Sequence, residues 1–381
     1  MASPQQQDPR LINQSQRAIV TGNSQRMVQQ IFSGSVDPNS NPTLNIAPRN
    51  VGLILGFLVE VSGGVTNGAT DAATRTGLGS ANVLQNITFT DLNNVQRINT
   101  RGSHIALLNS ARQGFGFGGA YAPNLPMAYG NNWGPFAGPA SLAADATGTV
   151  KHTYYVPLAY SSQDLRGAIY AAVVNATMNL QLRIADDDEL FVGATDPLGA
   201  VYSGNANGGW TNTVTVNVYQ VYLDQLPVMN GQPVLPMLDL NTIYDLKNTV
   251  KTGMSVGEDF PVAYANFRQF LSTMPIFDNG GTFNSGSDVN TWAIQAANST
   301  NLMKVGPDIA ALEARQTFMG DPPPGVYYFD HRMKPIDTIT YGNMELVLNA
   351  STVNSNAQLV VCYEAFQNSN QVPMASSLSA G

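Results

Sequence analysis

Three histidines and one cysteine are the residues with the most obvious capacity for chemistry. His104, His152 and His331 lie far apart in the sequence, without the i, i+2 or i, i+4 spacing of a metal-binding pair. Cys362 is the single cysteine, which excludes an internal disulfide framework and gives no support for zinc or iron–sulfur ligation. The histidines are interpreted as strand or loop residues, with a three-histidine metal site built by a β-sandwich as the alternative.

One dense acidic run comprises Asp186, Asp187, Asp188 and Glu189. Carboxylates in a turn can bind calcium. The run lacks the alternating ligand positions and the sharp glycine turn of a dedicated calcium loop. A solvated hairpin end is therefore the favoured interpretation, and a cation site is the alternative.

Signatures of enzyme families are absent from the sequence. No H-E-x-x-H, G-x-S-x-G or phosphate loop ending in Gly-Lys-Ser/Thr occurs. The glycine-rich stretch GFGFGG from Gly114 precedes AYAP and not a helix, so it lacks a helix N-terminus that would bind phosphate. Asp330, His331 and Arg332 are interpreted as a local charge cluster, because adjacent strand residues point to opposite faces. We expect no enzymatic activity and no cofactor.

The charge balance restricts which partners the surface can bind. Lys and Arg number 18 and Asp and Glu 26, giving a net charge of −8, and charged residues form only 12% of the 381 positions. Binding to nucleic-acid phosphates needs clustered basic residues, so direct nucleic-acid binding is not expected. A surface of Asn, Gln, Ser, Thr and Gly repels its own copies weakly. The composition favours a protein that packs against itself, although secreted adhesins and lectins share it.

The hydrophobic pattern indicates the elements that position these residues. Short β-branched and aromatic runs alternate with turn signals, including Asn-Gly at 67/68, 207/208, 230/231 and 279/280, which is typical of a sandwich or barrel. Val214, Val216, Val218 and Val221 predict a strand with one buried face. Helices are predicted over Asp239–Val250 and over Pro307–Met319, the latter with Ile309, Leu312 and Phe318 as packing residues.

A weak internal repeat supports two similar units in tandem. Tyr-Tyr at 154/155 is followed after 21 positions by Asn175, and Tyr-Tyr at 327/328 is followed after 22 positions by Asn349. Similar sequence at similar spacing is the mark of repeated architecture.

The first 50 residues are predicted to form an arm. Asp8 followed by Pro9 starts a helix, and apolar residues at helical spacing as far as Ile31 share one face. Ser33 to Asn50, rich in Ser, Asn and Pro, is predicted to be a linker. The helix either docks on its own domain or meets a neighbouring subunit or a lipid surface. The candidate contact residues are Arg10, Leu11, Ile12, Arg17, Ile19, Val20, Met27 and Ile31.

Several collinear segments resemble the major capsid protein of tectiviruses, icosahedral phages with a membrane inside the protein shell. Together they cover most of the chain from Asn50 to about Glu364 and coincide mainly with predicted strands and the inter-unit segment. The segments are NVGLILGFLVEV from Asn50, YVPLAYSSQDLRGA from Tyr155, YQVYLDQLPVMNGQPVLPMLDLNTIYDL from Tyr219, YANFRQFLSTMPIFDNGGTFN from Tyr264 and GVYYFDHRMKPIDTITYGN from Gly325.

The resemblance implies an all-β double jelly roll, which is two tandem eight-stranded antiparallel β-sandwiches with an N-terminal helical arm and a few short helices. The expected divisions are an arm at 1–50, a first jelly roll at 51–238, an inter-roll helix and linker at 239–258, a second jelly roll at 259–367 and a C-terminal tail at 368–381.

The implied function is that of a major capsid protein whose pseudo-hexagonal homotrimers tile an icosahedral shell. The expected partners are neighbouring trimers, penton and minor capsid proteins, and the internal membrane through the arm. The expected location is the virion, and the host cytoplasm during assembly. The alternative is a carbohydrate-binding or carbohydrate-active β-sandwich, with Trp133, Trp210 and Trp292 as stacking platforms and the acidic run as its acids.

Overall fold

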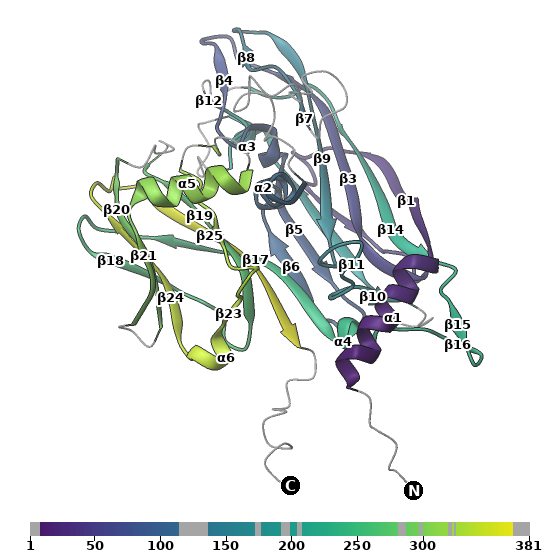
Figure 1. Ribbon diagram of the computed structural model, residues 1–381. Helices are drawn as coiled ribbons and strands as arrows, with labels where there is room; N and C mark the ends of the chain where they lie inside the picture. Colours follow the sequence, from purple (N-terminus) through teal and green to yellow (C-terminus); the bar gives the residue numbers. More distant parts are fainter. Residues whose placement is uncertain are drawn as a thin grey trace, which may run out of the picture.

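The chain folds into two β-sandwiches that lie side by side, with short helices at their junction and at their ends (Figure 1). The computed structural model describes residues 8–113, 136–171, 177–191, 199–203, 208–280, 287–296, 300–318, 322–323 and 325–368. The glycine-rich stretch from Gly114 lies outside these residues.

The first sandwich has a seven-stranded antiparallel sheet on its outer side. Its order is β1-β14-β3-β9-β7, and two short strands, β10 and β13, also pair with β3. The strands are β1 Gln25–Val36, β3 Leu53–Thr66, β7 Phe136–Ala137, β9 Thr147–Pro157, β10 Ile169–Tyr170, β13 Gly209–Trp210 and β14 Val214–Asp224.

A nine-stranded sheet belongs to both sandwiches. Its order is β2-β11-β5-β6-β17-β25-β19-β22, and β23 also pairs with β19. The strands are β2 Thr43–Ile46, β5 Leu84–Thr90, β6 Gln96–Thr100, β11 Asn179–Ile184, β17 Thr242–Thr252, β19 Gln269–Asp278, β22 Phe329–Asp330, β23 Ile336–Asp337 and β25 Gln358–Asn368.

A four-stranded sheet, β18-β24-β20-β21, closes the second sandwich. Its strands are β18 Asp259–Ala263, β20 Val289–Ala296, β21 Thr300–Val305 and β24 Met344–Ala350. Two small sheets complete the strands, β12-β4-β8 and β15-β16. These are β4 Ala73–Arg75, β8 Ser141–Leu142, β12 Tyr202–Ser203, β15 Val228–Met229 and β16 Gln232–Pro233.

Within the described residues, one continuous hydrogen-bonded sheet thus runs through both sandwiches. The two halves join where β6 of the first half and β17 of the second pair in parallel, with Leu246 opposite Ile98 and Lys247 opposite Asn99. A parallel pair needs a long connection between its strands, and here the remainder of the first half supplies it.

Each sandwich has its own apolar core. Phe57 and Val218 from the outer sheet meet Phe89 and Leu182 from the shared sheet in the first core. In the second, Trp292 and Leu348 face Phe277 and Leu359. The four valines predicted to share one face of a strand are all buried on β14, which confirms that prediction.

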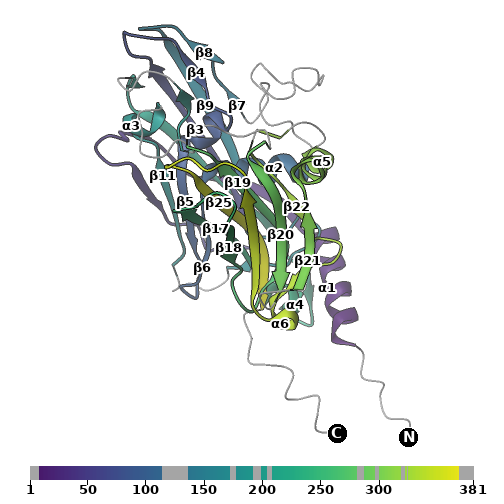
Figure 2. The same ribbon diagram turned by 90° about the vertical axis from the view of Figure 1, so that its left-hand side faces the viewer.

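Helices lie at the junction and at the ends of the sandwiches. They are α1 Pro9–Asn23, α2 Gly102–Gln113, α3 Asp187–Leu190, α4 Met237–Leu240, α5 Pro307–Phe318 and α6 Thr338–Tyr341, with a 3₁₀ turn at Gly79–Val83. The helix α2, which the sequence pattern did not predict, lies beside α5 over the shared sheet (Figure 2). Leu107 of α2 and Phe318 of α5 belong to one buried cluster with Met274 and Cys362 of the sheet.

The predicted helix over Asp239–Val250 is wrong. Only Met237–Leu240 is helical, and Thr242–Thr252 is strand β17, so the segment expected as an inter-roll helix and linker contains a central strand. Ile243, Tyr244 and Leu246 are all buried, because the first half of this strand is covered on both faces. A strand buried on both faces lacks the alternation of apolar and polar residues that identifies a strand in a sequence. The apolar residues that remain can then match the spacing expected of a helix.

Two other helix predictions are correct in part. The predicted helix from Pro307 forms as α5, and Phe318 is buried as expected, but Ile309 and Leu312 are exposed while Ala310 and Ala314 face the sheet. The N-terminal helix begins at Pro9 as predicted and ends at Asn23. The predicted linker from Ser33 contains the end of β1 and all of β2.

A buried ion pair ties the two halves together. The Arg112 guanidinium on α2 bonds to the Glu364 carboxylate on β25, which is fully buried. Arg112 also donates to the Tyr244 hydroxyl at 2.7 Å and to the Tyr160 carbonyl at 2.8 Å, and the Ser272 hydroxyl donates to Glu364 at 3.0 Å. The charged groups therefore have hydrogen-bond partners from both sandwiches, which offsets the cost of burying them.

Replacing Arg112 with Met should lower the free energy of unfolding by roughly 3–5 kcal/mol, because the Glu364 charge would stay buried without its cation. Urea unfolding measures the loss. Arg332, whose pair with Asp330 is partly exposed, is the matched control, and Arg332→Met should cost about 1 kcal/mol or less. Equal losses in the two variants would contradict the assigned role of Arg112.

Candidate functional site at the N-terminal helix

The helix α1 lies at the lower end of the first sandwich, beside α4 and the β15–β16 hairpin (Figure 1). Asp8 caps the helix by accepting a hydrogen bond from the Arg10 amide at 2.9 Å, and Pro9 occupies the first turn. The helix ends after Gly22 and Asn23, and the chain continues directly into β1. Met27 and Ile31 therefore lie on a strand and not on the helix, which corrects the predicted helical face.

The helix is anchored by one apolar side chain and one polar cluster. Val20 is fully buried against Leu53, Val221 and Val234. Arg17 donates to both carboxylate oxygens of Asp239, at 2.5 and 2.6 Å, and the Asn13 amide donates to the same carboxylate at 2.9 Å.

The electrostatics of this anchor favour the charged forms. The hydrogen bond to Asp239 raises the pKa of Arg17 above its ordinary value, against the opposing effect of burial. Burial tends to raise the pKa of neighbouring Asp164, but its hydrogen bond with Arg166 and the nearby Arg17 charge lower it overall. The sequence pattern identified Arg17 but not Asp239 as a contact, because 222 positions separate them.

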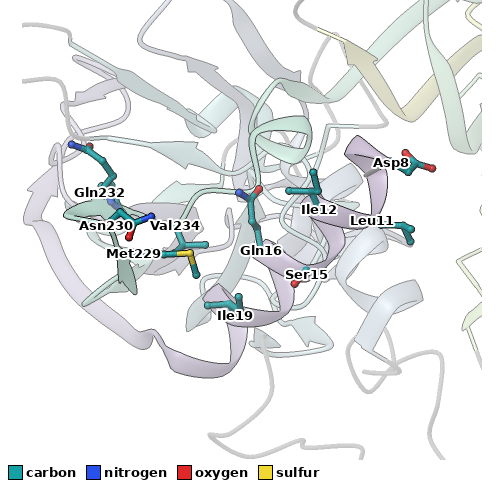
Figure 3. A pocket seen from close by; sticks show the side chains of 11 residues that line it. Asp8, Leu11, Ile12, Ser15, Gln16, Ile19, Met229, Asn230, Gln232 and Val234 are labelled. Carbon is teal, nitrogen blue, oxygen red and sulfur yellow. The ribbon is translucent and has the colours of Figure 1, made fainter. Parts of the chain in front are cut away.

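Between α1 and the hairpin lies a groove of about 640 Å³ (Figure 3). A two-residue turn at Asn230 and Gly231, both with positive φ, forms the hairpin as the Asn-Gly signal predicted. Leu11, Ile12 and Met229 are exposed at the groove, whereas Val234 forms its buried wall. The complete lining is Asp8, Leu11, Ile12, Ser15, Gln16, Ile19, Met229, Asn230, Gln232, Pro233 and Val234.

The predicted arm residues thus divide into two groups. Arg17 and Val20 anchor the helix to its own sandwich, and Ile19 is half-buried beside them. Arg10, Leu11 and Ile12 face outward near the first turn. The helix both docks on its own domain and presents an apolar surface.

The acidic run forms the start of α3. Asp186 and Glu189 make a reciprocal capping box, and Arg183 donates to Glu189 at 2.8 Å. Asp187 accepts hydrogen bonds from the Trp210 amide at 2.7 Å and from the Asn39 side chain at 2.9 Å. The described part of the chain contains no group of three or more His, Cys, Asp or Glu placed to hold a metal ion.

Trp210 and Trp292, the two tryptophans within the described residues, do not form stacking platforms. The Trp292 ring is fully buried in the second core, and the Trp210 ring is buried with its indole nitrogen donating to the Ala185 carbonyl at 2.7 Å. Trp133 lies outside the described residues. The carbohydrate-binding alternative therefore has no support from Trp210 or Trp292, since stacking on a sugar needs an exposed ring.

His104 and His152 are buried and separate. His104 contacts the Thr100 hydroxyl at 2.7 Å, and His152 contacts the Ser80 hydroxyl at 3.0 Å. Burial lowers the pKa of each to about 3, with the nearby Arg112 charge as a second cause for His104. Both are core residues that are neutral in the folded protein at neutral pH.

Comparison with known proteins identifies the family of this chain. The profile described as "P3 major capsid protein N-terminal" matches residues 6–226, and that described as "P3 major capsid protein C-terminal" matches residues 241–380. The "Major capsid protein P3" of Enterobacteria phage PRD1 is 39% identical over 371 residues, which cover 96% of this chain and 94% of that protein. The chain belongs to the P3 major capsid protein family. It is a structural subunit of a viral capsid and not an enzyme.

Solved structures confirm the double jelly-roll fold. The atomic structure of Sulfolobus Turreted Icosahedral Virus contains a chain that matches with a TM-score of 0.64 at 11% identity, over 92% of this chain and 93% of that one. A chain of the PBCV-1 virus capsid matches with a TM-score of 0.55 at 10% identity, over 91% and 95% of the two chains.

A capsid protein assembles with other capsid subunits. No helix within the described ranges is long and apolar enough to cross a bilayer.

Replacing Asp239 with Asn should loosen α1, because Arg17 and Asn13 would lose the carboxylate that both bind. We expect faster cleavage by a protease between α1 and β1, with the remainder of the capsid protein intact. Asp224→Asn, on an exposed strand end of the same sandwich, is the control. Equal cleavage rates for Asp239→Asn and the wild type would show that Asp239 does not anchor the helix.

Acid should destabilise the subunit through its buried histidines. The unfolded protein binds protons at His104 and His152 near pH 6.5, whereas the folded protein does so only near pH 3. Their stabilising effect is complete above pH 6.5 and is lost as the pH falls towards 3, by about 2 kcal/mol for each histidine at pH 5. Urea midpoints at pH 7.5 and pH 5 measure this, and His152→Gln should flatten the dependence. If the urea midpoint of His152→Gln falls between pH 7.5 and pH 5 by as much as that of the wild type, protonation of His152 is not a cause of the acid sensitivity.

Proposed function

We propose that the capsid protein forms homotrimers with a pseudo-hexagonal outline that tile an icosahedral shell around an internal membrane. The observation that carries this proposal is the side-by-side pair of sandwiches joined by one sheet (Figure 1). Three such chains around a threefold axis place six sandwiches in a ring, so a trimer approximates sixfold symmetry. Closed cyclic symmetry is the usual outcome when identical subunits associate.

The surface chemistry supports extensive contact between copies. Charged residues are only 12% of the sequence, and several of them are used inside the subunit, including Arg97 with Asp91 and Arg112 with Glu364. Neutral polar surface is less costly to desolvate than charged surface. Neighbouring trimers, penton proteins and minor capsid proteins are the partners that such contacts would serve.

The end of the molecule that carries α1 is proposed to face the membrane. Large exposed hydrophobic side chains lie there on three neighbouring elements: Leu11 and Ile12 on α1, Val228 and Met229 on the hairpin, and Met237 and Leu238 on α4. Arg10 lies on the same helix and could meet anionic lipid headgroups, an attraction worth about 1 kcal/mol per basic residue near the surface. The helix would lie on the membrane, since it is too short to cross it.

The purified protein should sediment as a trimer at micromolar concentration and appear by electron microscopy as particles with six lobes. Obligate interfaces of this kind bury about 2,000–5,000 Å² or more, so dissociation on moderate dilution is not expected. The trimer should also float with vesicles that contain anionic lipid, and Arg10→Glu should reduce the floating fraction.

Lys304→Glu is the control for the vesicle experiment, because Lys304 is an exposed basic residue on β21 of the other sandwich. A stable monomer at micromolar concentration would refute the trimer. Equal floating fractions for the two charge variants would refute the membrane-facing role of α1.

A further inference from the structure

Four Asn-Gly pairs occur in this chain, at 67/68, 207/208, 230/231 and 279/280. An Asn before Gly readily loses its side-chain amide, because glycine has no side chain to hinder its backbone nitrogen from attacking the Asn Cγ. In a folded protein the reaction also needs a mobile Asn side chain and open space around the glycine nitrogen. Asn207 lies outside the described residues, and the other three positions differ in both respects.

The side chains of Asn67 and Asn279 are held in place. Each residue is only 2% exposed. The Asn67 side-chain nitrogen donates to three backbone carbonyl oxygens at 2.7–3.2 Å. The Asn279 side chain donates to the Asp288 carboxylate at 2.7 Å and accepts from the Asn354 amide at 2.6 Å. Turning either Cγ towards the following glycine would break these bonds inside closely packed protein, which is costly.

Asn230 has none of these restraints. It is exposed at the turn of the β15–β16 hairpin, beside the groove (Figure 3), and its side chain makes no hydrogen bond to the described residues. A Cβ placed on Gly231 would meet no heavy atom within 4 Å apart from its chain neighbours. The nitrogen that attacks and the Cγ that is attacked therefore both lie in open space.

The hairpin itself restrains Asn230 only weakly. Two residue pairs join its strands, Val228 with Pro233 and Met229 with Gln232, and the strands form a sheet of their own. A separate two-stranded hairpin has little stability of its own, so local opening of the turn costs little free energy. Opening releases Asn230 from the positive φ of the turn, 53°, and lets its Cγ approach the Gly231 nitrogen.

We infer that Asn230 is a site of spontaneous deamidation in this capsid protein. The Gly231 backbone nitrogen gives up its proton and forms a bond to the Asn230 Cγ, and the side-chain nitrogen leaves as ammonia. Water then opens the resulting cyclic imide at either of its carbonyl carbons, which gives aspartate or isoaspartate. Each product carries a carboxylate where the subunit had a neutral amide, and isoaspartate also lengthens the backbone of the turn.

The new carboxylate adds a negative charge beside α1. Asp8 is the one charged residue among those that line the groove, so deamidation doubles the charge there. Its effect on function rests on the proposed membrane-facing role of α1 and the hairpin, in which Arg10 attracts anionic lipid. A negative charge at position 230 opposes that attraction. A subunit that stays in solution before assembly therefore binds the membrane more weakly with time.

The reaction is tested by incubating the full-length protein at mildly alkaline pH and mapping its peptides by mass spectrometry. Asn230 should lose its amide at least tenfold faster than Asn67 and Asn279, and isoaspartate should be among the products. In urea the three positions should react at similar rates, because each then precedes an unhindered glycine. Equal rates in the folded protein, or aspartate without isoaspartate, would overturn the inference.

Vesicle flotation tests the effect of the added charge. Asn230→Asp reproduces the charge of the product, and Asn230→Gly, its matched control, keeps a residue that suits the turn. The Asp variant should bind anionic vesicles roughly fivefold more weakly than the Gly variant, since one charge near such a surface is worth about 1 kcal/mol. Equal binding by the two variants, with Arg10→Glu still reducing flotation, would refute the effect on membrane binding. Unchanged flotation of Arg10→Glu would instead refute the proposed membrane-facing role.

Discussion

The fixed relation between the two sandwiches is the constraint on which the rest of the molecule depends. Only two residue pairs join β6 to β17, which is a short contact for two whole sandwiches. The junction is reinforced by the helices α2 and α5 over the shared sheet and by the bond between Arg112 and Glu364. If the sandwiches could turn against each other, the groove beside α1 would have no constant position relative to the second sandwich. Because the two sandwiches are held together at the shared sheet, they behave as one rigid unit.

Several of the few charged residues of this chain hold elements together inside the subunit. Arg17 with Asp239 holds the N-terminal helix, Arg112 with Glu364 holds the junction, and Arg268 with Asp245 holds the turn before β19. Buried pairs of this kind add little net stability but are costly to break. Their main effect is therefore to fix the positions of the elements that they join. Their net contribution to the free energy of unfolding is small. Because charged residues form only 12% of the sequence, the outer surface repels its own copies weakly, which suits a capsid subunit.

The sequence predicts elements well where burial is one-sided. The valines of β14 alternate because one face meets the core, and the start of α1 is marked by Asp8 and Pro9. Prediction fails for β17, whose first half is buried on both faces, and for the end of α1, where the apolar residues of β1 continue the helical spacing. The resemblance to tectivirus capsid proteins supplied the tandem architecture that periodicity alone leaves open.

The candidate site was predictable only in part, for a reason of distance along the chain. Leu11 and Ile12 follow from helical periodicity, and the hairpin follows from its Asn-Gly turn. The placement of the helix beside the hairpin does not follow from either pattern. It depends on Asp239, which binds Arg17 of α1 and lies 222 positions further along the chain. A pattern within one segment cannot report which remote carboxylate a given arginine will reach.

The anchor of the helix also connects it to the junction between the sandwiches. Asp239 belongs to α4, directly before β17, and its carbonyl accepts a hydrogen bond from the Gly167 amide at 3.3 Å. The Gly167 carbonyl in turn accepts a bond at 2.7 Å from Arg97, a residue of β6. Arg17 is thus linked through Asp239 and Gly167 to the two strands that join the halves. The position of α1 is set by the shared sheet, so the surface that it presents is a property of the paired sandwiches and not of a detachable arm.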